Sequence, residues 1–522
     1  MKSVKSLLLG ASAALFAVAG AQAADLPVKA KPVQYVKVCS LYGAGFYYIP
    51  GTDMCVRVGG YVRSQLEWGS VNGVSPGTIG PAGFATSTNT GAIGTLANGQ
   101  FDRGSNNFNM TNRGVLSVDA RNQTEYGTVR GYIALGGQTI SPGTTTATFF
   151  FERAFIQFAG FTFGRTQSFF DVFTTTEHFN YIESKTSGDT YNYGVDLIGY
   201  TAQFGNGISA SISAESPHYL QTSAVVDGTA AAFSSTTPLT VTDATGHNVP
   251  DIVGQVRIDQ NWGSLGVSGA AHKVAGRYFT TPGLPANGHP DDKTGWAVQL
   301  GGQLNLPWGD TIGASVVDTK GAVAYATKAG SWAITNGSAG GVGWLTDGIF
   351  DGPGVPATAN TQIHLTNAWS VNAAYEHFWN PRWRTSLYGG YTKVWYDGTI
   401  TNDINTHLPG AAGTIQCGVP VAGAVWPPIN MANGGAGNSC SPDFSFYQIG
   451  SRTQWNITKD FYMGLDVTYT HLNTAYQGVI APTTISGRTF TSIDNQNTWS
   501  GVFRTQYSFS PGNEGASLVL GR

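Results

Sequence analysis

The sequence predicts an all-β protein, a 16-stranded antiparallel transmembrane β-barrel with short turns on its periplasmic side and long external loops. Three observations predict this fold class. The chain is poor in charged residues and rich in glycine and aromatic residues. Apolar side chains alternate with polar ones along many long segments. The connections between those segments are short and long in turn.

The composition of the 522 residues excludes several classes of protein. Charged residues make up 11% of the chain, against about 25% in soluble domains, whereas glycine (70 residues) and aromatic residues (12%) are abundant. No apolar run reaches the length of about 18 residues that a membrane-spanning helix needs. The net charge of −3 argues against nucleic-acid binding, and 41% hydrophobic residues argue against disorder. A mean hydropathy near zero fits a barrel, because its lipid-facing and water-facing residues average out.

The N-terminus has the pattern of a secretory signal peptide. Lys2 and Lys5 precede an apolar stretch from Leu7 to Ala21, and Ala23 ends a small-x-small cleavage signature. A membrane anchor is the alternative, but the stretch is short and rich in Gly and Ala. We therefore expect a signal peptide at 1–23, a periplasmic N-terminal segment at 24–53, the barrel at 54–509 and a C-terminal tail at 510–522.

Four cysteines remain after export: Cys39, Cys55, Cys417 and Cys440. An oxidising compartment permits disulfides, and four cysteines allow three pairings. Proximity in the sequence favours Cys39 with Cys55 and Cys417 with Cys440. Free or differently paired thiols are the alternative, whereas a zinc site would need closer pairs such as C-x2-C.

The strands are predicted from a period of two. After Cys55, apolar side chains such as Val62 and Leu66 fall on one face of the segment, and polar ones such as Arg63 and Gln65 fall on the other. This alternation indicates a half-buried strand, and most of the segments reach the 9–11 residues that a membrane-spanning strand needs. We expect sixteen such strands, at 54–68, 112–121, 127–136, 148–159, 161–167, 192–203, 207–215, 251–260, 264–273, 295–304, 311–318, 367–378, 382–396, 444–456, 461–471 and 497–509.

Seven short turns and eight long loops join these segments. The turns carry Gly, Asn, Asp and Pro, each of which suits a tight reversal of the chain. In hydrocarbon every backbone polar group needs an internal partner, so the sheet must close, and sixteen strands leave an aqueous lumen. A soluble sandwich, propeller or adhesin array is the alternative, but its exposed faces would carry more charge and its connections would not alternate so regularly.

The polar faces of the expected strands carry arginines that would line the water-filled bore. An arginine facing lipid at mid-membrane would cost about 2–4 kcal/mol, which favours the inward assignment. These residues are Arg57, Arg63, Arg121, Arg130, Arg257, Arg452 and Arg504.

The third long loop, at 168–191, is the expected source of opposing charge. It carries Asp171, Glu177, Glu183 and Asp189. If the loop folds into the lumen, these carboxylates face the wall arginines, and the resulting transverse field governs ion preference. If the loop lies outside the barrel, they are ordinary solvated acids.

The sequence gives little sign of catalysis. There is no Gly-Lys dipeptide and hence no phosphate-binding P-loop, and there is no H-E-x-x-H. The G-x-S-x-G pattern at 73–77 falls in an expected long loop and not at a strand-to-helix turn. The nine histidines are scattered without metal-ligand spacing. We therefore expect no enzyme activity, no metal, no cofactor and no nucleic-acid partner.

Nearly the whole mature chain resembles the alphaproteobacterial porin family. The likeness is most specific at 24–68, with ADLP at 24–27, and at 151–175, with RAFIQF at 153–158 and FGRTQ at 163–167. The resemblance implies a 16-stranded homotrimeric general diffusion porin of the bacterial outer membrane, surrounded by lipid and lipopolysaccharide, through which ions and small hydrophilic solutes diffuse passively. It implies that the third loop bends inward as a constriction, and it supports a disulfide between Cys39 and Cys55. Such porins end at or near an aromatic residue of the last strand, whereas here Phe509 is followed by 510–522.

Two other functions stay open from the sequence. A substrate-selective channel on the same barrel would show saturable block of its conductance by one class of solute. A secreted β-rich adhesion or binding protein would dissolve without detergent and would give no channel steps.

Overall fold

The computed structural model describes residues 38–69, 108–141, 147–191, 194–217, 224–227, 244–278, 288–328, 332–336, 338–343, 345–350, 362–398, 439, 441–485 and 488–509. The expected signal peptide, Cys417, Cys440 and the tail at 510–522 lie outside these residues. Among the residues described, no helix combines the length and the apolar character that a membrane span requires.

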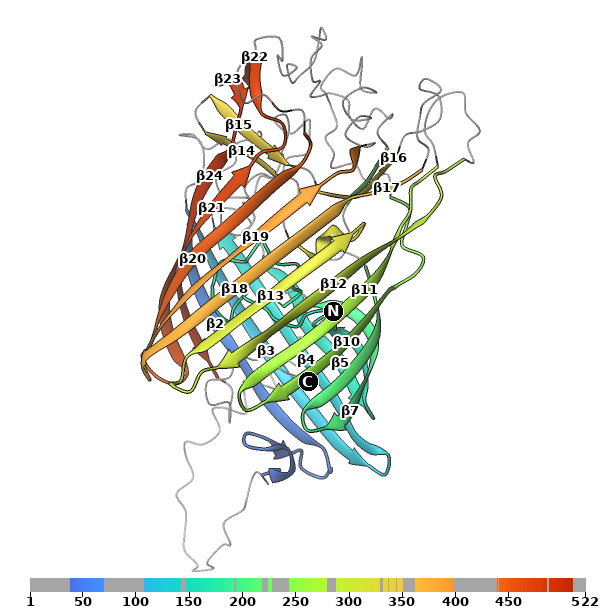
Figure 1. The fold of residues 1–522 in the computed structure, drawn as a ribbon. Helices are drawn as coiled ribbons and strands as arrows, with labels where there is room; N and C mark the ends of the chain where they lie inside the picture. Colours follow the sequence, from blue (N-terminus) through green and yellow to red (C-terminus); the bar gives the residue numbers. More distant parts are fainter. Residues whose placement is uncertain are drawn as a thin grey trace, which may run out of the picture.

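All sixteen expected strands are present, and they form one closed barrel (Figure 1). Each strand pairs antiparallel with the next, and the first and last strands also pair with each other, from Tyr61 opposite Ser508 to Gly69 opposite Ser500. The barrel strands are β2 (Cys55–Gly69), β3 (Phe108–Thr124), β4 (Gly127–Ser141), β5 (Thr148–Phe158), β6 (Phe161–Thr166), β7 (Val195–Gly205), β8 (Ile208–Glu215), β10 (Asp251–Gln260), β11 (Gly263–Val274), β12 (Lys293–Asn305), β13 (Thr311–Lys320), β18 (Asn367–Asn380), β19 (Trp383–Trp395), β20 (Phe444–Asn456), β21 (Phe461–Asn473) and β24 (Gln496–Ser508). Closure gives every strand a neighbour on both sides, which is what a sheet in hydrocarbon requires.

The barrel is built inside out, with apolar side chains on its outer face. In β2, the apolar Val62 and Leu66 are 58% and 39% exposed, whereas the polar residues on either side of Leu66, Gln65 and Glu67, are 4% and 0% exposed. The same alternation follows the other strands, whose outward positions carry Leu, Ile, Val and Phe. An apolar exterior around a polar interior is stable only if the exterior meets lipid.

Tryptophans line the turn end of the barrel from β10 to β20. Trp262 and Trp308 lie in turns, and Trp383 stacks on Trp455 of the neighbouring strand with ring centroids 5.6 Å apart. All four are exposed. Tryptophan favours the boundary between hydrocarbon and water, so this row marks one edge of the membrane.

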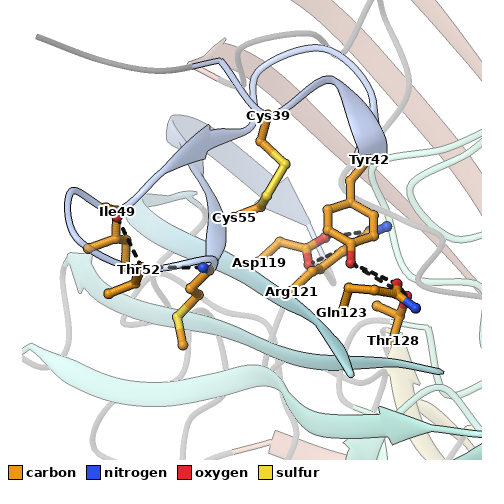
Figure 2. The surroundings of a disulfide bond; sticks show 10 residues. Cys39, Tyr42, Ile49, Thr52, Cys55, Asp119, Arg121, Gln123 and Thr128 are labelled. Atoms are coloured by element: carbon orange, nitrogen blue, oxygen red, sulfur yellow. Dashed lines mark hydrogen bonds and ion pairs between the residues drawn. A yellow bond between two sulfur atoms is a disulfide. The ribbon is translucent and has the colours of Figure 1, made fainter. Parts of the chain in front are cut away.

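The N-terminal segment adds a disulfide-linked hairpin at the turn end (Figure 2). The strand β1 (Tyr47–Tyr48) pairs with the start of β2, and the 3-10 helix η1 (Ser40–Tyr42) precedes it. Cys39 and Cys55 form the expected disulfide, with Cα atoms 6.0 Å apart. The hairpin is held to the barrel because the Phe46 ring lies 4.9 Å from the guanidinium carbon of Arg57.

Short elements that the sequence did not predict fill the loop end. One three-stranded sheet consists of β9 (Ala224–Asp227), β16 (Thr346–Phe350) and β17 (His364–Leu365), and a four-stranded sheet consists of β14 (Trp332–Asn336), β15 (Ala339–Gly343), β22 (Gly478–Ile485) and β23 (Arg488–Ile493). The 3-10 helix η3 (Val323–Tyr325) is buried beside them. Tyr325, Ile349 and Phe446 belong to one apolar cluster with Phe170 of the third loop, so the external loops pack onto that loop from above.

Candidate functional site

The third loop, 168–191, folds into the barrel between β6 and β7, as expected. Its backbone and side chains are held by the walls on opposite sides of the lumen. The Val172 amide donates to Gln299 of β12, the Tyr181 amide to Asp466 of β21, and the Lys185 amide to Gln448 of β20. Most of its side chains are buried. The loop is therefore a fixed partition of the bore.

Glycines on the inner wall provide the space in which this loop is seated. A Cβ atom at Gly313 would lie 2.1 Å from the Phe173 ring, and one at Gly464 would lie 2.2 Å from the Tyr181 hydroxyl. Comparable contacts occur for Gly199 with Phe169, Gly266 with Val172 and Gly390 with Thr186. These distances are 2.5 Å for Gly199, 3.0 Å for Gly266 and 2.1 Å for Gly390. A Cβ atom would therefore force the loop side chain to move at four of these positions, and at Gly266 the contact would be tight. Part of the high glycine content thus serves the packing of the third loop against the barrel.

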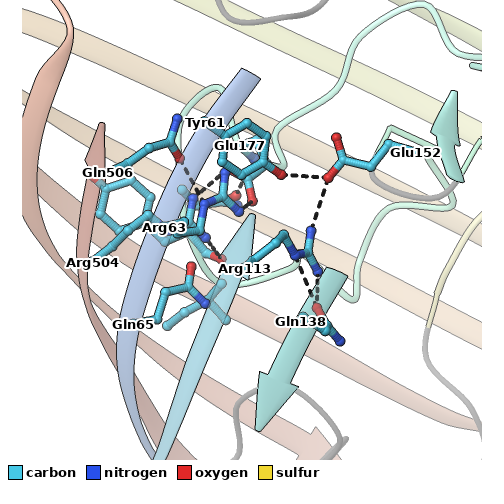
Figure 3. Close-up of polar contacts among 12 residues, drawn as sticks. Tyr61, Arg63, Gln65, Arg113, Gln138, Glu152, Glu177, Arg504 and Gln506 are labelled. Atoms are coloured by element: carbon cyan, nitrogen blue, oxygen red, sulfur yellow. Dashed lines mark hydrogen bonds and ion pairs between the residues drawn. The ribbon is translucent and has the colours of Figure 1, made fainter. Parts of the chain in front are cut away.

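Glu177 anchors the loop to two wall arginines, and we call Arg63, Arg504 and Glu177 the mid-wall cluster (Figure 3). The Arg63 guanidinium donates to both carboxylate oxygens of Glu177 at 2.9 Å, and Arg504 donates to the second oxygen. Burial raises the pKa of Glu177, but Arg504 and Arg63 outweigh it and lower that pKa to about 2. Glu177 is therefore ionised at any physiological pH.

The other three acids of the loop have contacts within the loop or with a neighbouring loop. Asp171 accepts from the amide and the hydroxyl of Thr190 at 2.8 and 2.7 Å, within the loop itself. Glu183 forms ion pairs with Lys185 and Lys328, and Asp189 forms one with Lys328 at 2.9 Å.

Two of the four loop carboxylates that were expected to face the wall arginines, Glu183 and Asp189, are thus paired with lysines instead. Glu177 does meet the wall arginines, and its two arginine partners outnumber it. Lys185 and then Lys328 lower the pKa of Glu183 to about 2 against the opposing effect of burial. Lys328 comes from the loop that follows β13, and this second loop cancels acid charge that the sequence assigned to the pore.

Three of the expected arginines share one carboxylate near the turn end, and we call Arg57, Arg121, Arg130 and Asp119 the rim cluster. Arg121 and Arg130 each donate twice to Asp119, at 2.8–3.1 Å, and Arg57 lies 3.7 Å from it. Asp119 is buried, whereas the arginines are partly exposed. The cluster therefore presents a net positive charge to the lumen.

Arg384, Arg452 and Glu376 form a third group, the Glu376 cluster. Arg452 pairs with one carboxylate oxygen of Glu376, and Arg384 lies 3.4 Å from the other. The side chain of Arg384 is 27% exposed, and its Nε has no hydrogen-bond partner within the described part of the chain.

Arg452 and Arg504 point into the barrel, but the expectation that they line open water is wrong. Their exposed fractions are 0% and 1%, because the ring of Tyr181 covers both, with the guanidinium carbons 5.3 and 4.3 Å from its centroid. Arg257 lines the opposite wall, where it pairs with Asp259 at 2.8 Å and donates to the carbonyl of Val172.

Sequence reasoning missed several charged residues on the lumen wall, among them Arg113, Glu152, Arg153, Glu376 and Arg384. Arg113 precedes Arg121 by eight residues, which is four repeats of the strand alternation, so both lie on the same face and the period of two could have found Arg113. Glu152 and Arg153 both enter the lumen because a β-bulge opposes Ala134 to Arg153 and Leu135 to Phe151. A bulge places two neighbours on one face, which strict alternation forbids.

Between the turns and the third loop lies a cavity of about 1390 Å³, the turn-side vestibule. Gly160, Pro381 and Lys459 mark its mouth in three turns, and Glu177 and Phe179 of the third loop form its far end. Its charged lining consists of Arg63, Arg113, Arg121, Arg130, Arg153, Arg382, Arg384 and Lys459 against Glu152, Glu177, Asp259, Glu376 and Asp460. Within the described residues, no group of three His, Cys, Asp or Glu side chains is placed to hold a metal ion.

Comparison with known proteins agrees with this geometry. Residues 25–502 match the family model described as a porin subfamily. The chain belongs to this porin subfamily. An inside-out barrel of this family is a protein of the bacterial outer membrane, and the row of tryptophans and the apolar exterior are its contacts with lipid.

Related porins come from Brucella. The chain is 36% identical over 227 residues to porin Omp2a of Brucella melitensis biotype 1 (strain 16M), which covers 41% of this chain and 56% of the relative. It is 33% identical over 282 residues to porin Omp2b of Brucella suis biovar 1 (strain 1330), which covers 50% of this chain and 64% of the relative. The match thus spans somewhat more than half the length of these curated relatives. The solved structure of the outer membrane channel DcaP of Acinetobacter baumannii has the same fold, with a TM-score of 0.54 at 14% identity over 88% of this chain and 99% of that one.

Proposed function

We propose that this protein is an outer-membrane channel through which ions and small hydrophilic solutes diffuse passively. The observation that carries the proposal is a closed, lipid-compatible barrel whose charged vestibule leads to a constriction made by its own third loop. Charged, hydroxyl and amide side chains from several strands line the passage, which suits hydrated solutes. On this proposal the turn end faces the periplasm and the long loops face the outside of the cell.

Planar-bilayer recording of the purified, detergent-extracted protein tests the proposal. We expect stepwise conductance that is ohmic at low voltage and unaffected by millimolar neutral sugars. A protein that dissolves without detergent and produces no steps would be a secreted binding protein instead. Saturable block by one solute class would identify a substrate-selective channel.

We further propose that three copies assemble, with contacts centred on β5 to β8. β6 has six residues and β8 has eight, fewer than the 9–11 that span a bilayer. Lipid alone would leave the ends of these strands opposite hydrocarbon, whereas a neighbouring barrel can cover them. Exposed Phe149, Phe151 and Phe163 supply apolar contact area on this wall.

The test of this assembly is electrophoretic. Unheated protein is expected to migrate as a trimer and heated protein as a monomer. Phe163→Arg should convert the unheated form to monomer, while the same change at Ile449, which is equally outward on the far wall, should leave the trimer intact. Equal behaviour of the two variants would place the contact elsewhere.

Lipopolysaccharide is the proposed neighbour at the loop-end rim of each copy. Lys320 and Lys393 are exposed near the loop ends of β13 and β19 on the outer face. Ammonium groups at that height suit the phosphates of the outer leaflet. Replacing both lysines by Gln should weaken co-purification of lipopolysaccharide without changing conductance.

A further inference from the structure

The charges around the vestibule are distributed unevenly between its walls. The rim cluster holds three arginines against one carboxylate, and the mid-wall and Glu376 clusters each hold two against one. Arg153 donates to the carbonyls of Glu152 and Tyr191, and no carboxylate of the described residues lies within ion-pair distance of it. Apart from Glu177 of the third loop, these groups belong to the wall formed by β2 to β5 and β18 to β24. On that wall Arg113 and Glu152 pair one to one, and Asp466 lies near Arg452. The vestibule lining as a whole still holds eight basic side chains against five carboxylates.

The facing wall, from β7 to β13, is neutral. Its contribution to the vestibule lining is Thr, Ser and Gln, together with Asp259. Asp259 is the one charged residue of that part of the lining, and Arg257 compensates it at 2.8 Å. A solute in the vestibule therefore lies between a basic wall and a wall of hydroxyl and amide groups.

From this distribution we infer that the vestibule binds small anions, carboxylates and phosphate esters, in preference to cations, and that the channel is anion-selective. The inference rests on the proposed channel function and names its substrate class. Arg384 is the side chain best placed to hold the anion. Its side chain lines the vestibule and is 27% exposed, and its contact with Glu376 is long, at 3.4 Å, so the exposed part of the guanidinium can bind the carboxylate of a solute.

The Coulomb energy sets the size of the effect. In water, one uncompensated charge at roughly 7 Å changes the local concentration of a monovalent ion about threefold. The effect falls at high salt because the Debye length shrinks from about 10 Å at 0.1 M to about 3 Å at 1 M. Selectivity should therefore be strong in dilute KCl and weak in concentrated KCl.

The experiment compares reversal potentials in a KCl gradient for the wild-type protein, Arg384→Gln and Arg165→Gln. Arg165 is a matched control, because it is the same residue type on the outer face, paired with Asp196. We expect a chloride-to-potassium permeability ratio above one for the wild type, a decrease of about two- to threefold for R384Q, and no change for R165Q. Arg384→Lys keeps the charge and should retain the preference, which separates electrostatics from misfolding.

Flux into proteoliposomes gives an independent readout with solutes of similar size. Succinate should enter faster than succinamide, and succinamide faster than 1,4-diaminobutane. Channel steps with a permeability ratio at or below one, or equal effects of R384Q and R165Q, would overturn the anion preference and leave the channel function intact. Absence of channel steps would overturn the proposed function itself.

Discussion

Glu177→Gln tests whether the mid-wall cluster is the anchor that holds the third loop in the bore. The substitution removes the one negative charge between Arg63 and Arg504. The side chains of these three residues are 9%, 2% and 13% exposed, in the order Arg63, Arg504, Glu177. Removing one partner of a buried ion pair typically costs about 3–5 kcal/mol, because the remaining charge is left uncompensated. Here two guanidinium groups lose the same partner.

The loss of stability should be confined to the part of the third loop that Glu177 holds in place. The amides of Tyr181 and Ile182 donate to Asp466 at 2.6 and 3.0 Å, four and five residues beyond Glu177. A local cost of about 3 kcal/mol corresponds to exchange more than a hundredfold faster at these amides if they exchange by local opening. Hydrogen–deuterium exchange of the peptide that contains them measures this directly.

Glu152→Gln is the matched control for charge. Glu152 lines the same vestibule and pairs with Arg113 at 3.3 Å, but it belongs to β5 and not to the loop. Both variants should increase anion preference by a similar factor, since each removes one negative charge. Only E177Q should accelerate exchange at Tyr181 and Ile182. Equal exchange in the two variants, or a shift of E177Q toward cations, would refute the reasoning.

Three further predictions follow from other parts of the structure. Gly313→Ala places a Cβ atom 2.1 Å from the Phe173 ring and should push that ring into the bore, which lowers single-channel conductance. Gly254→Ala is the control, because a Cβ atom there meets nothing within 4 Å, and its conductance should match the wild type. Equal conductances of the two variants would show that the Phe173 ring can move to another position without narrowing the bore. Cys39→Ser removes a disulfide between residues 16 positions apart and should lower the free energy of unfolding of the N-terminal hairpin by about 3 kcal/mol. Hydrogen–deuterium exchange around Tyr47 should become faster. Unchanged exchange would mean that the hairpin is stable without the disulfide. Burial and then Asp189 raise the pKa of Asp171 to about 7, so the folded loop binds this proton more tightly than the unfolded chain does. The stability of the loop should therefore decrease as the pH rises from about 4 to about 7. Asp171→Asn should remove this pH dependence from the hydrogen–deuterium exchange of the loop amides, and an unchanged pH dependence would mean that another group causes it.

The strands could be predicted from the sequence because a barrel in lipid imposes one rule on every residue. The polar Gln65 and Glu67 are buried and the apolar Val62 and Leu66 are exposed, and the alternation of the letters encodes that arrangement directly. Even the six-residue β6 was found, because it is flanked by a tight turn at Gly160.

The charge partners could not be predicted in this way. The alternation of apolar and polar residues shows which face of the sheet a side chain lies on, but not its position along the barrel axis or its neighbour. It could therefore not show that Asp119 forms ion pairs with three arginines or that Glu376 forms ion pairs with two. Arg153 reaches the lumen through a bulge that breaks the alternation. Tyr181 covers Arg452 and Arg504 from a loop whose path depends on glycines in five different strands. Each of these is a tertiary contact between segments far apart in the chain.

The sign of the field in the bore depends on where each carboxylate is neutralised, and not on how many the third loop contains. A carboxylate within 3 Å of a lysine contributes little at the distance of a passing ion, because the two charges act as a dipole whose field decays faster than that of a single charge. Glu183 and Asp189 are in this position through Lys185 and Lys328. The loop's acidic residues therefore fix its own shape, and the unpaired arginine charge of the wall acts on the solute. A loop rich in acid can in this way narrow a channel that favours anions.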